Sequence, residues 1–246
     1  MGLAVELSNR AKWVLELHPP ELQDTSTKLP ERARAAALAA LDRGETHYTD
    51  RPGILPLREQ VADWLEQHYS VRVNPKTSVV ITCGDTEARF VALQQLLKPG
   101  DALLCLGDAS LVKPALVIRG AEFVAAQAEV EPRGLEAVKG LYLSVTAPPD
   151  LRDKWLKEAE ARGWWLIFDV TADPNFEFHP ATNPQLSART VTIGGVGYEQ
   201  GLESWRVGFL AAPDEEAPEL RSFKQSLTIC TTNVSQWAAL GLLEDA

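Results

Sequence analysis

The stretch Ser78-Val-Val-Ile-Thr-Cys83 opens the segment that decides the fold of this chain. It is a nearly continuous apolar run, as expected of a strand that is buried on both faces of a parallel sheet. A helical pattern runs from Thr86 to Leu97, and a second apolar run, Ala102-Leu-Leu-Cys-Leu106, comes soon after it. A strand, a helix and a strand in this order predict a crossover unit of an α/β sheet.

The same alternation continues toward the C-terminus. Helical patterns at 111–119 and 151–162 separate most of the later apolar runs, which predict strands at 122–125, 141–145, 164–169 and 190–193. A seventh strand, Arg206 to Ala211, follows too closely for a crossover and is predicted to be antiparallel. We therefore predict a three-layer α/β fold with helices on both faces of a mostly parallel, seven-stranded sheet.

Two helices are predicted ahead of this sheet. An alanine-rich helical run from Glu31 to Asp42 stops at Arg43-Gly44, and residues 56–69 carry an apolar stripe at helical spacing. We expect two parts: an N-terminal segment, residues 1–43, and a large domain, residues 44–246.

Composition limits the classes of function. The 246 residues are 45% hydrophobic and 24% charged, and no apolar stretch approaches the roughly 18 residues of a membrane span. A net charge of −10 with scattered basic residues argues against a nucleic-acid partner. The start of the chain lacks the layout of a secretion signal, so we expect a cytoplasmic protein. The three cysteines and four histidines lack the spacing of a metal site, and the histidines are expected at the surface or at caps.

The segment Thr192-Ile-Gly-Gly-Val-Gly-Tyr198-Glu-Gln-Gly-Leu-Glu-Ser-Trp205-Arg206-Val-Gly-Phe209 resembles the lysine segment of class I/II aminotransferases, which use pyridoxal phosphate. In that family a lysine precedes Trp-Arg-x-Gly by seven residues, and Tyr198 stands in its place. Four further stretches match the family's pattern in order: Gly44 to Glu59, Gly84 to Ala88, Lys98 to Asp101 and Ser235 to Ala239.

The resemblance implies a set of cofactor-binding positions. Asp169 aligns with the aspartate that holds the proton of the pyridinium nitrogen. Arg206, Gly84 and Thr86 align with positions around the cofactor phosphate, and Tyr48 with a tyrosine that reaches the phosphate site of a neighbouring subunit. Structural roles stay open for two of these residues, because Arg206 could pair with Asp85 and Tyr48 could be a dimer contact.

Several positions depart from the family's pattern. The phenol of Tyr198 cannot form the imine that the lysine forms with the cofactor aldehyde. The chain also ends at Ala246, where the family continues into the domain that grips the substrate carboxylate, so we expect a reduced small domain. Further departures are Asp85 in the phosphate turn, Leu111 in place of the stacking ring, Thr146 to Pro149 without an asparagine, Ala172 in place of a tyrosine and Gly195 in place of a serine.

The leading hypothesis is an aminotransferase-like protein without transaminase activity that acts by binding, as a homodimer, with a small-molecule anion or a protein as partner. No cofactor is expected under this hypothesis, with pyridoxal phosphate bound only non-covalently if at all. The alternative is a pyridoxal-phosphate-dependent transferase or lyase with a lysine from elsewhere, or another enzyme that reuses the ancestral pocket through Asp169, Tyr198 and Arg206. A third possibility is a fragment of a longer chain. Convergence of these three side chains on one open pocket would favour an enzyme or a ligand site.

Overall fold

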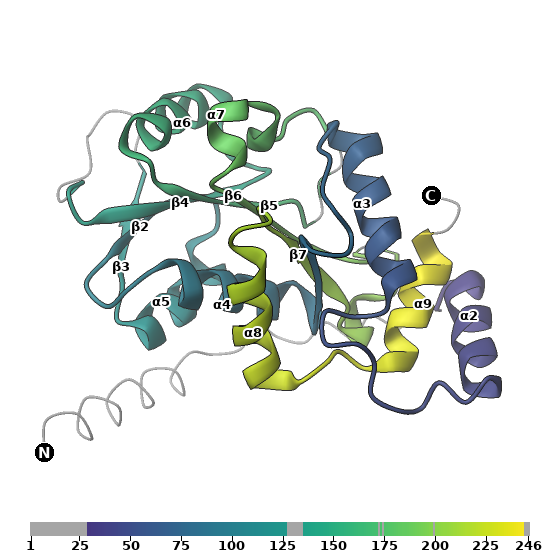
Figure 1. Ribbon diagram of the computed structural model, residues 1–246. Coiled ribbons are helices and arrows are strands. Elements are labelled where there is room, and N and C mark those ends of the chain that lie inside the picture. The colour runs from purple at the N-terminus through teal and green to yellow at the C-terminus, as the bar shows by residue number, and fades with distance from the viewer. Residues whose placement is uncertain (1–28, 127–134, 172, 174, 199, 244–246) are drawn as a thin grey trace, which may run out of the picture.

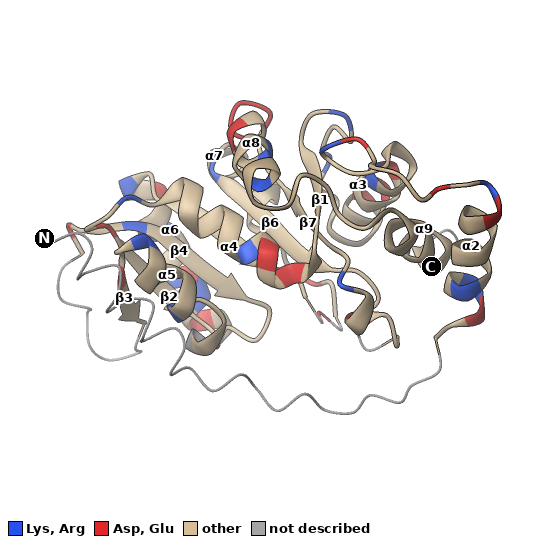
Figure 2. Cartoon of the chain, turned by 90° about the horizontal axis from the view of Figure 1, so that it is seen from below, with Lys and Arg blue, Asp and Glu red and all other residues tan. Residues whose placement is uncertain are grey.

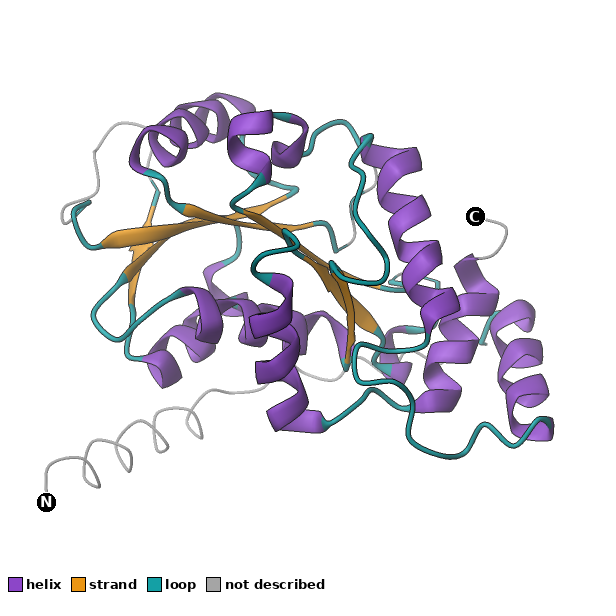
Figure 3. Ribbon diagram, viewed as in Figure 1, coloured by secondary structure: helices purple, strands orange, loops and turns teal. Residues whose placement is uncertain are grey.

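A seven-stranded sheet with helices on both faces forms the centre of the protein (Figures 1 and 3). The computed structural model describes residues 29–126, 135–171, 173, 175–198 and 200–243. The strand order is β1-β7-β6-β5-β4-β2-β3. The strands are β1 (Val79–Thr82), β2 (Ala102–Leu106), β3 (Glu122–Ala125), β4 (Val138–Ser144), β5 (Trp165–Asp169), β6 (Thr190–Gly195) and β7 (Gly208–Ala211). The α/β fold predicted from the sequence is confirmed.

Strands β2 to β6 are parallel, and β7 runs antiparallel to both β6 and β1. The antiparallel direction of the seventh strand is therefore confirmed. The strand begins at Gly208 rather than at Arg206, because Arg206 has a left-handed backbone with φ 57° that ends the short helix η3 (Glu203–Trp205).

Helices cover the two faces of the sheet as separate layers (Figure 1). One face carries the layer with α3, α6 and α9, and the opposite face carries α4, α5 and α8. Each layer encloses its own apolar core against the sheet, because side chains alternate between the two faces along every strand. The helices are α2 (Glu31–Asp42), α3 (Leu55–Tyr69), α4 (Gly84–Leu96), α5 (Lys113–Arg119), α6 (Pro149–Arg162), α7 (Pro184–Ser187), α8 (Ala217–Thr228) and α9 (Asn233–Leu243), with 3-10 turns η1 (Ala109–Leu111) and η2 (Pro180–Thr182).

Two of the sequence motifs are joined by buried hydrogen bonds. The side chain of Gln236 is fully buried, and its Oε1 accepts a hydrogen bond from the Ile54 N–H at 2.9 Å while its Nε2 donates to the Thr231 carbonyl at 2.8 Å. In the other motif the guanidinium of Arg58 donates to the carbonyls of Gly53 (3.1 Å) and Pro75 (2.7 Å). These motif residues therefore fix the chain ahead of α3 against α9 and the loop before β1.

Helix α2 packs against α9 through small residues. Ala33, Ala37 and Ala40 are buried in α2, and a Cβ added at Gly241 of α9 would come within 3.0 Å of the Arg32 carbonyl oxygen. Small side chains allow two helix backbones to approach this closely. The boundary at residue 43 stays a prediction, although the described part of the N-terminal segment contacts the large domain.

His179 lies in the interior rather than at the surface. Its side chain is 2% exposed, its Nδ1 accepts the Ala181 N–H at 3.1 Å, and its Nε2 lies 2.9 Å from Thr192 Oγ1. The expected capping role is present at η2, and the expected surface position is wrong because the turn packs onto the start of β6.

Charged residues are spread over the molecule. Figure 2 shows charges of both signs on α4 and α8 and no continuous basic stripe over α4, α5 and α8. Within the described ranges, no helix is long and apolar enough to cross a membrane, and no group of His, Cys, Asp and Glu side chains has the arrangement of a metal site.

Candidate functional site

Three of the predicted positions gather at one edge of the sheet. Asp169 ends β5, Gly195 ends β6, and Gly84 begins α4 directly after β1. This edge carries the carboxyl ends of the parallel strands, which is where α/β sheets of this kind bind ligands. We infer that this edge is the candidate site.

On the α4 face, Asp169 is the centre of a buried network. Its carboxylate is 3% exposed, and its Oδ2 accepts hydrogen bonds from Arg89 Nε at 2.6 Å and from the Tyr142 hydroxyl at 2.5 Å. Its Oδ1 accepts the Thr171 N–H at 3.0 Å. Arg89 reaches Asp85, one turn earlier in α4, through Nη2 at 2.5 Å. The network joins the end of β5 to the first turn of α4.

The charges of this network are mutually dependent. Burial lowers the pKa of Arg89, but the carboxylates of Asp169 and Asp85 outweigh it and leave that pKa raised above its ordinary value. Burial and the neighbouring Asp169 carboxylate also raise the pKa of Tyr142, so the phenol stays protonated and donates to the carboxylate. Arg89 and Tyr142 are site residues that the sequence analysis missed. Asp85 and Arg89 at i and i+4 on one helix were the available signal.

Arg206 lies beside Cys83 and Gly84, in the turn between β1 and α4, and does not pair with Asp85. Its Nη2 donates to the Cys83 carbonyl at 3.2 Å, and a Cβ added at Gly84 would lie 3.2 Å from its guanidinium carbon. Gly84 has φ +80°, and its lack of a Cβ lets the Arg206 guanidinium pack against the backbone. No acidic partner of Arg206 lies within ion-pair distance in the described part of the chain, because Arg89 holds Asp85. The exposed Thr86 lies in the same first turn of α4.

An unpaired hydroxyl lies within this group. Thr171 Oγ1 is buried and has no hydrogen-bond partner among the described residues. A Cβ added at Gly195 would lie 3.5 Å from Thr171 Cγ2 and 3.7 Å from Asp85 Cβ. Buried hydroxyls are nearly always satisfied. The ends of β5 and β6 therefore hold a polar atom that a ligand could satisfy.

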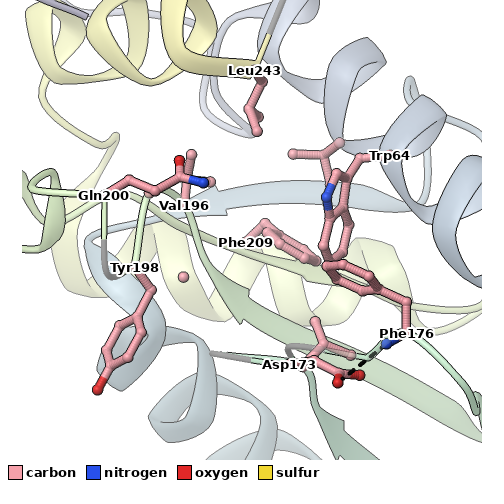
Figure 4. A pocket seen from close by; sticks show the side chains of 12 residues that line it. Trp64, Asp173, Phe176, Val196, Tyr198, Gln200, Phe209 and Leu243 are labelled. Carbon is pink, nitrogen blue, oxygen red and sulfur yellow. Dashed lines mark hydrogen bonds between the residues drawn. The ribbon is translucent and has the colours of Figure 1, made fainter. Parts of the chain in front are cut away.

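The α3 face of the same edge holds a cavity of about 150 Å³. Trp64 of α3, Phe176 and Phe209 line it, and Val170 contributes from the end of β5 (Figure 4). Asp169 points to the opposite face because neighbouring residues of a strand alternate. Tyr198 contributes to the rim, and its ring points away from the three aromatic rings and is 45% exposed.

Asp169, Tyr198 and Arg206 therefore do not converge on one open pocket. Asp169 is enclosed on the α4 face, and neither it nor Arg206 lines the cavity beside Tyr198. Tyr48 is 76% exposed in the loop before α3. Leu111, predicted opposite the ring, is 41% exposed, and Ala172 lies outside the described residues.

Two lysines are candidates for the hypothesis in which a lysine at another position replaces the one missing at Tyr198. Lys224 of α8 is fully buried, and its Nζ lies 3.5 Å from Thr231 Oγ1. Burial lowers its pKa. Lys113 is exposed, and its Nζ lies 4.7 Å from the centre of the Phe123 ring. Neither side chain lines the cavity beside Tyr198.

The sequence profile described as aminotransferase class I and II matches residues 18–107. Over 240 residues, 88% of this chain, the sequence is 27% identical to aromatic-amino-acid aminotransferase 2 of Thermococcus litoralis. It is 26% identical over 238 residues, 87% of this chain, to aspartate aminotransferase of Thermotoga maritima. The sequence is therefore similar to class I and II aminotransferases over most of the chain. It spans 62% and 63% of the lengths of these two relatives.

Solved aminotransferase structures share the fold. The aromatic aminotransferase from Pyrococcus horikoshii superposes with a TM-score of 0.81 at 22% identity, covering 97% of this chain and 71% of that one. The aspartate aminotransferase from Thermotoga maritima gives 0.76 at 24% identity, covering 98% and 71%. The seven-stranded sheet and its helix layers are therefore those of the aminotransferase fold.

This similarity corrects one expectation. We expected no cofactor, with pyridoxal phosphate bound only non-covalently if at all, and that expectation is wrong because the aminotransferases to which the chain is related are pyridoxal phosphate enzymes. Pyridoxal phosphate is the cofactor to which the family points. This cofactor has three groups that a protein must accommodate, namely its phosphate, its ring and its aldehyde.

The fit differs between the two ends of the cofactor. At the phosphate end, the start of α4 and the guanidinium of Arg206 beside Gly84 suit an anion. At the ring, Asp169 is present with Arg89 already bonded to it, and the unpaired Thr171 hydroxyl lies nearby. At the aldehyde end, Tyr198 supplies no amine, so the residues do not fit imine formation there.

Proposed function

We propose that this aminotransferase-family protein binds a phosphate-bearing ligand of the pyridoxal type at the start of α4 and does not catalyse transamination by itself. The observation that carries the proposal is the contrast between Arg206, which has no acidic partner in the described part of the chain, and Tyr198, which supplies no amine. A guanidinium beside a helix N-terminus attracts an anion, whereas a phenol cannot condense with an aldehyde.

The phosphate site rests on three supports. The first-turn N–H groups of α4 point toward the N-terminal end of the helix, as they do at every helix start. Gly84 lets the Arg206 guanidinium lie against the start of α4, and Arg206 supplies two-pronged donors with a fixed charge. Asp85 would repel an anion at this position, but its carboxylate is bound by Arg89, which balances its charge. We propose Arg206, Gly84 and Thr86 as phosphate contacts, whereas Asp169 is already held by Arg89 and Tyr142.

The absence of transamination rests on the lysine position. Bound pyridoxal phosphate supplies an aldehyde and an electron-accepting ring, and the protein must add an amine that moves the substrate proton. Tyr198 has an exposed ring directed away from the aromatic cavity. Lys224 has a pKa lowered by burial, as a nucleophilic amine requires, yet it is fully enclosed. This enclosure argues against the alternative in which a lysine from elsewhere restores the enzyme.

Calorimetric titration with pyridoxal phosphate and with pyridoxal tests the phosphate site, because the two ligands differ only in the phosphate. We expect pyridoxal phosphate to bind about tenfold or more tightly than pyridoxal, and Arg206→Met to remove most of that difference. Arg34→Met, on the exposed side of α2, is the matched control and should change neither affinity. Equal affinities of the wild-type protein for the two ligands would contradict the proposal.

The oligomeric state and the cellular compartment of the protein are also matters of proposal. We propose that the protein is a cytoplasmic homodimer, with the exposed Tyr48 in the interface as the resemblance suggests. Sedimentation equilibrium of the wild-type protein and of Tyr48→Asp tests the dimer. A dimer that the substitution weakens supports the proposal, and a wild-type monomer at micromolar concentrations rejects it.

A further inference from the structure

The cavity on the α3 face is not used by the proposed phosphate site. Its volume is about 150 Å³, which is the size of an engineered cavity that holds benzene in another protein. Trp64, Phe176 and Phe209 provide aromatic walls, and Val61 and Leu243 close it on the helix side. Figure 4 shows the rings of Trp64 and Phe209 directed toward the pocket. The cavity therefore has room for one six-membered ring or a similar apolar body.

One charged side chain faces this apolar space. Asp173 lines the cavity, and its Oδ2 accepts the Tyr69 hydroxyl at 2.7 Å. Its Oδ1 accepts the N–H groups of Asn175 (3.0 Å) and Phe176 (3.3 Å). All three donors are neutral, and Asp173 forms no ion pair with any described residue. The Asp173 carboxyl group therefore lies at the wall of an aromatic cavity without a cationic partner among the described residues.

The segment that carries this carboxylate is held in an unusual conformation. Phe176 has φ 52°, which is rare for a bulky side chain and costs free energy. Its ring packs edge-on against Trp64 at a centroid distance of 5.7 Å and at a tilt against His68 at 4.3 Å. The bonds from Asp173 to the backbone at 175 and 176 stabilise this turn, so the carboxylate and the aromatic wall are fixed together.

We propose that this pocket binds a small organic cation with an apolar body, of the arylmethylammonium type. The aromatic walls hold the ring by dispersion, and their electron-rich faces also attract a positive charge. The ammonium group donates to Asp173, whose remaining lone pairs have no cationic partner among the described residues. The inference does not rest on the phosphate site, which lies on the other face of the sheet.

Calorimetric titration with three ligands of one shape tests the proposal: benzylamine, benzyl alcohol and benzoate. We expect benzylamine to bind in the millimolar range, about tenfold more tightly than benzyl alcohol, and benzoate not to bind. Asp173→Asn keeps the shape of the side chain and removes its charge. It should lower the affinity for benzylamine to that for benzyl alcohol.

Leu243→Trp, which fills the cavity from the end of α9, should abolish binding of benzylamine and benzyl alcohol alike. Leu227→Trp, on an exposed part of α8, is its matched control and should leave both affinities unchanged. Benzylamine binding no tighter than that of benzyl alcohol, or unaffected by Leu243→Trp in a protein with a normal unfolding transition, would overturn the proposal. Because no probe carries a phosphate, failure here would leave the Arg206 proposal standing.

Discussion

Arg89 Nε donates to Asp169 Oδ2 at 2.6 Å in a pair whose side chains are 6% and 3% exposed. Sequence positions 80 residues apart are thereby joined beneath the carboxyl edge of the sheet. Breaking such a pair leaves a charge without a partner in the interior, which is more costly than losing a contact at the surface.

Arg89→Met should lower the free energy of unfolding by about 3–5 kcal/mol, because Asp169 and Asp85 lose their shared cation. Urea denaturation followed by circular dichroism measures the loss. Arg162→Met removes a half-exposed pair with Glu158 and is the matched control, with an expected loss of less than about 1 kcal/mol. Similar losses for the two variants would show that the buried network adds no stability beyond that of a surface pair.

Gln236→Leu should destabilise the protein by about 3 kcal/mol. Leucine has a side-chain volume similar to that of glutamine but cannot form its hydrogen bonds. The Ile54 N–H and the Thr231 carbonyl are therefore left without a partner in the interior. Thermal and urea unfolding should both report the loss. Gln185→Leu, at an exposed position, should change stability by less than about 0.5 kcal/mol and serves as the control.

His179 should make stability depend on pH. Burial lowers its pKa to about 3 from an ordinary value near 6.5. The unfolded chain therefore binds the proton first as pH falls, so the stabilisation is complete above about pH 6.5 and is lost progressively below it. Protonation of Nδ1 would also end its bond from the Ala181 N–H.

The expected loss from His179 between pH 7.5 and pH 5 is about 2 kcal/mol. It is measured as the difference between the wild-type protein and His179→Asn, whose side chain does not titrate in this range. A His179→Asn variant that loses as much stability as the wild type over this interval would show that His179 is not the source.

Strands such as β2 (Ala102–Leu106) could be predicted because they are uninterrupted apolar runs. Helix α8 escaped prediction because one of the three buried residues on its stripe is Lys224, which interrupts the apolar period. Burial of charge is a tertiary property, and the same reason explains Arg89. From the sequence alone, an arginine at position 89 is expected at the surface. Its burial is stabilised by the distant Asp169 carboxylate.

The candidate site was also predicted only in part. Alignment with the family located Asp169, Arg206 and Tyr198, but it could not say which face of the sheet each side chain would take. Asp169 turns to α4, whereas the cavity lies toward α3 and includes Val170. Strand alternation fixes this separation, and it depends on register that only the folded sheet defines.

Tyr198→Lys should restore an amine at the family's position. After incubation with pyridoxal phosphate and reduction with borohydride, peptide mapping should find the adduct on residue 198 of the variant. Tyr48→Lys, at an exposed loop, is the control for adventitious labelling. A specific adduct on Lys224 or Lys113 of the wild-type protein would favour an enzyme with a relocated lysine.

The central claim is that the chain, with Tyr198 at the lysine position, does not transaminate by itself. The most direct measurement is conversion of pyridoxal phosphate to pyridoxamine phosphate by a stoichiometric amount of wild-type protein supplied with aspartate or an aromatic amino acid. We expect a rate equal to that of the reagents without protein. A rate that rises in proportion to the wild-type protein would contradict this claim.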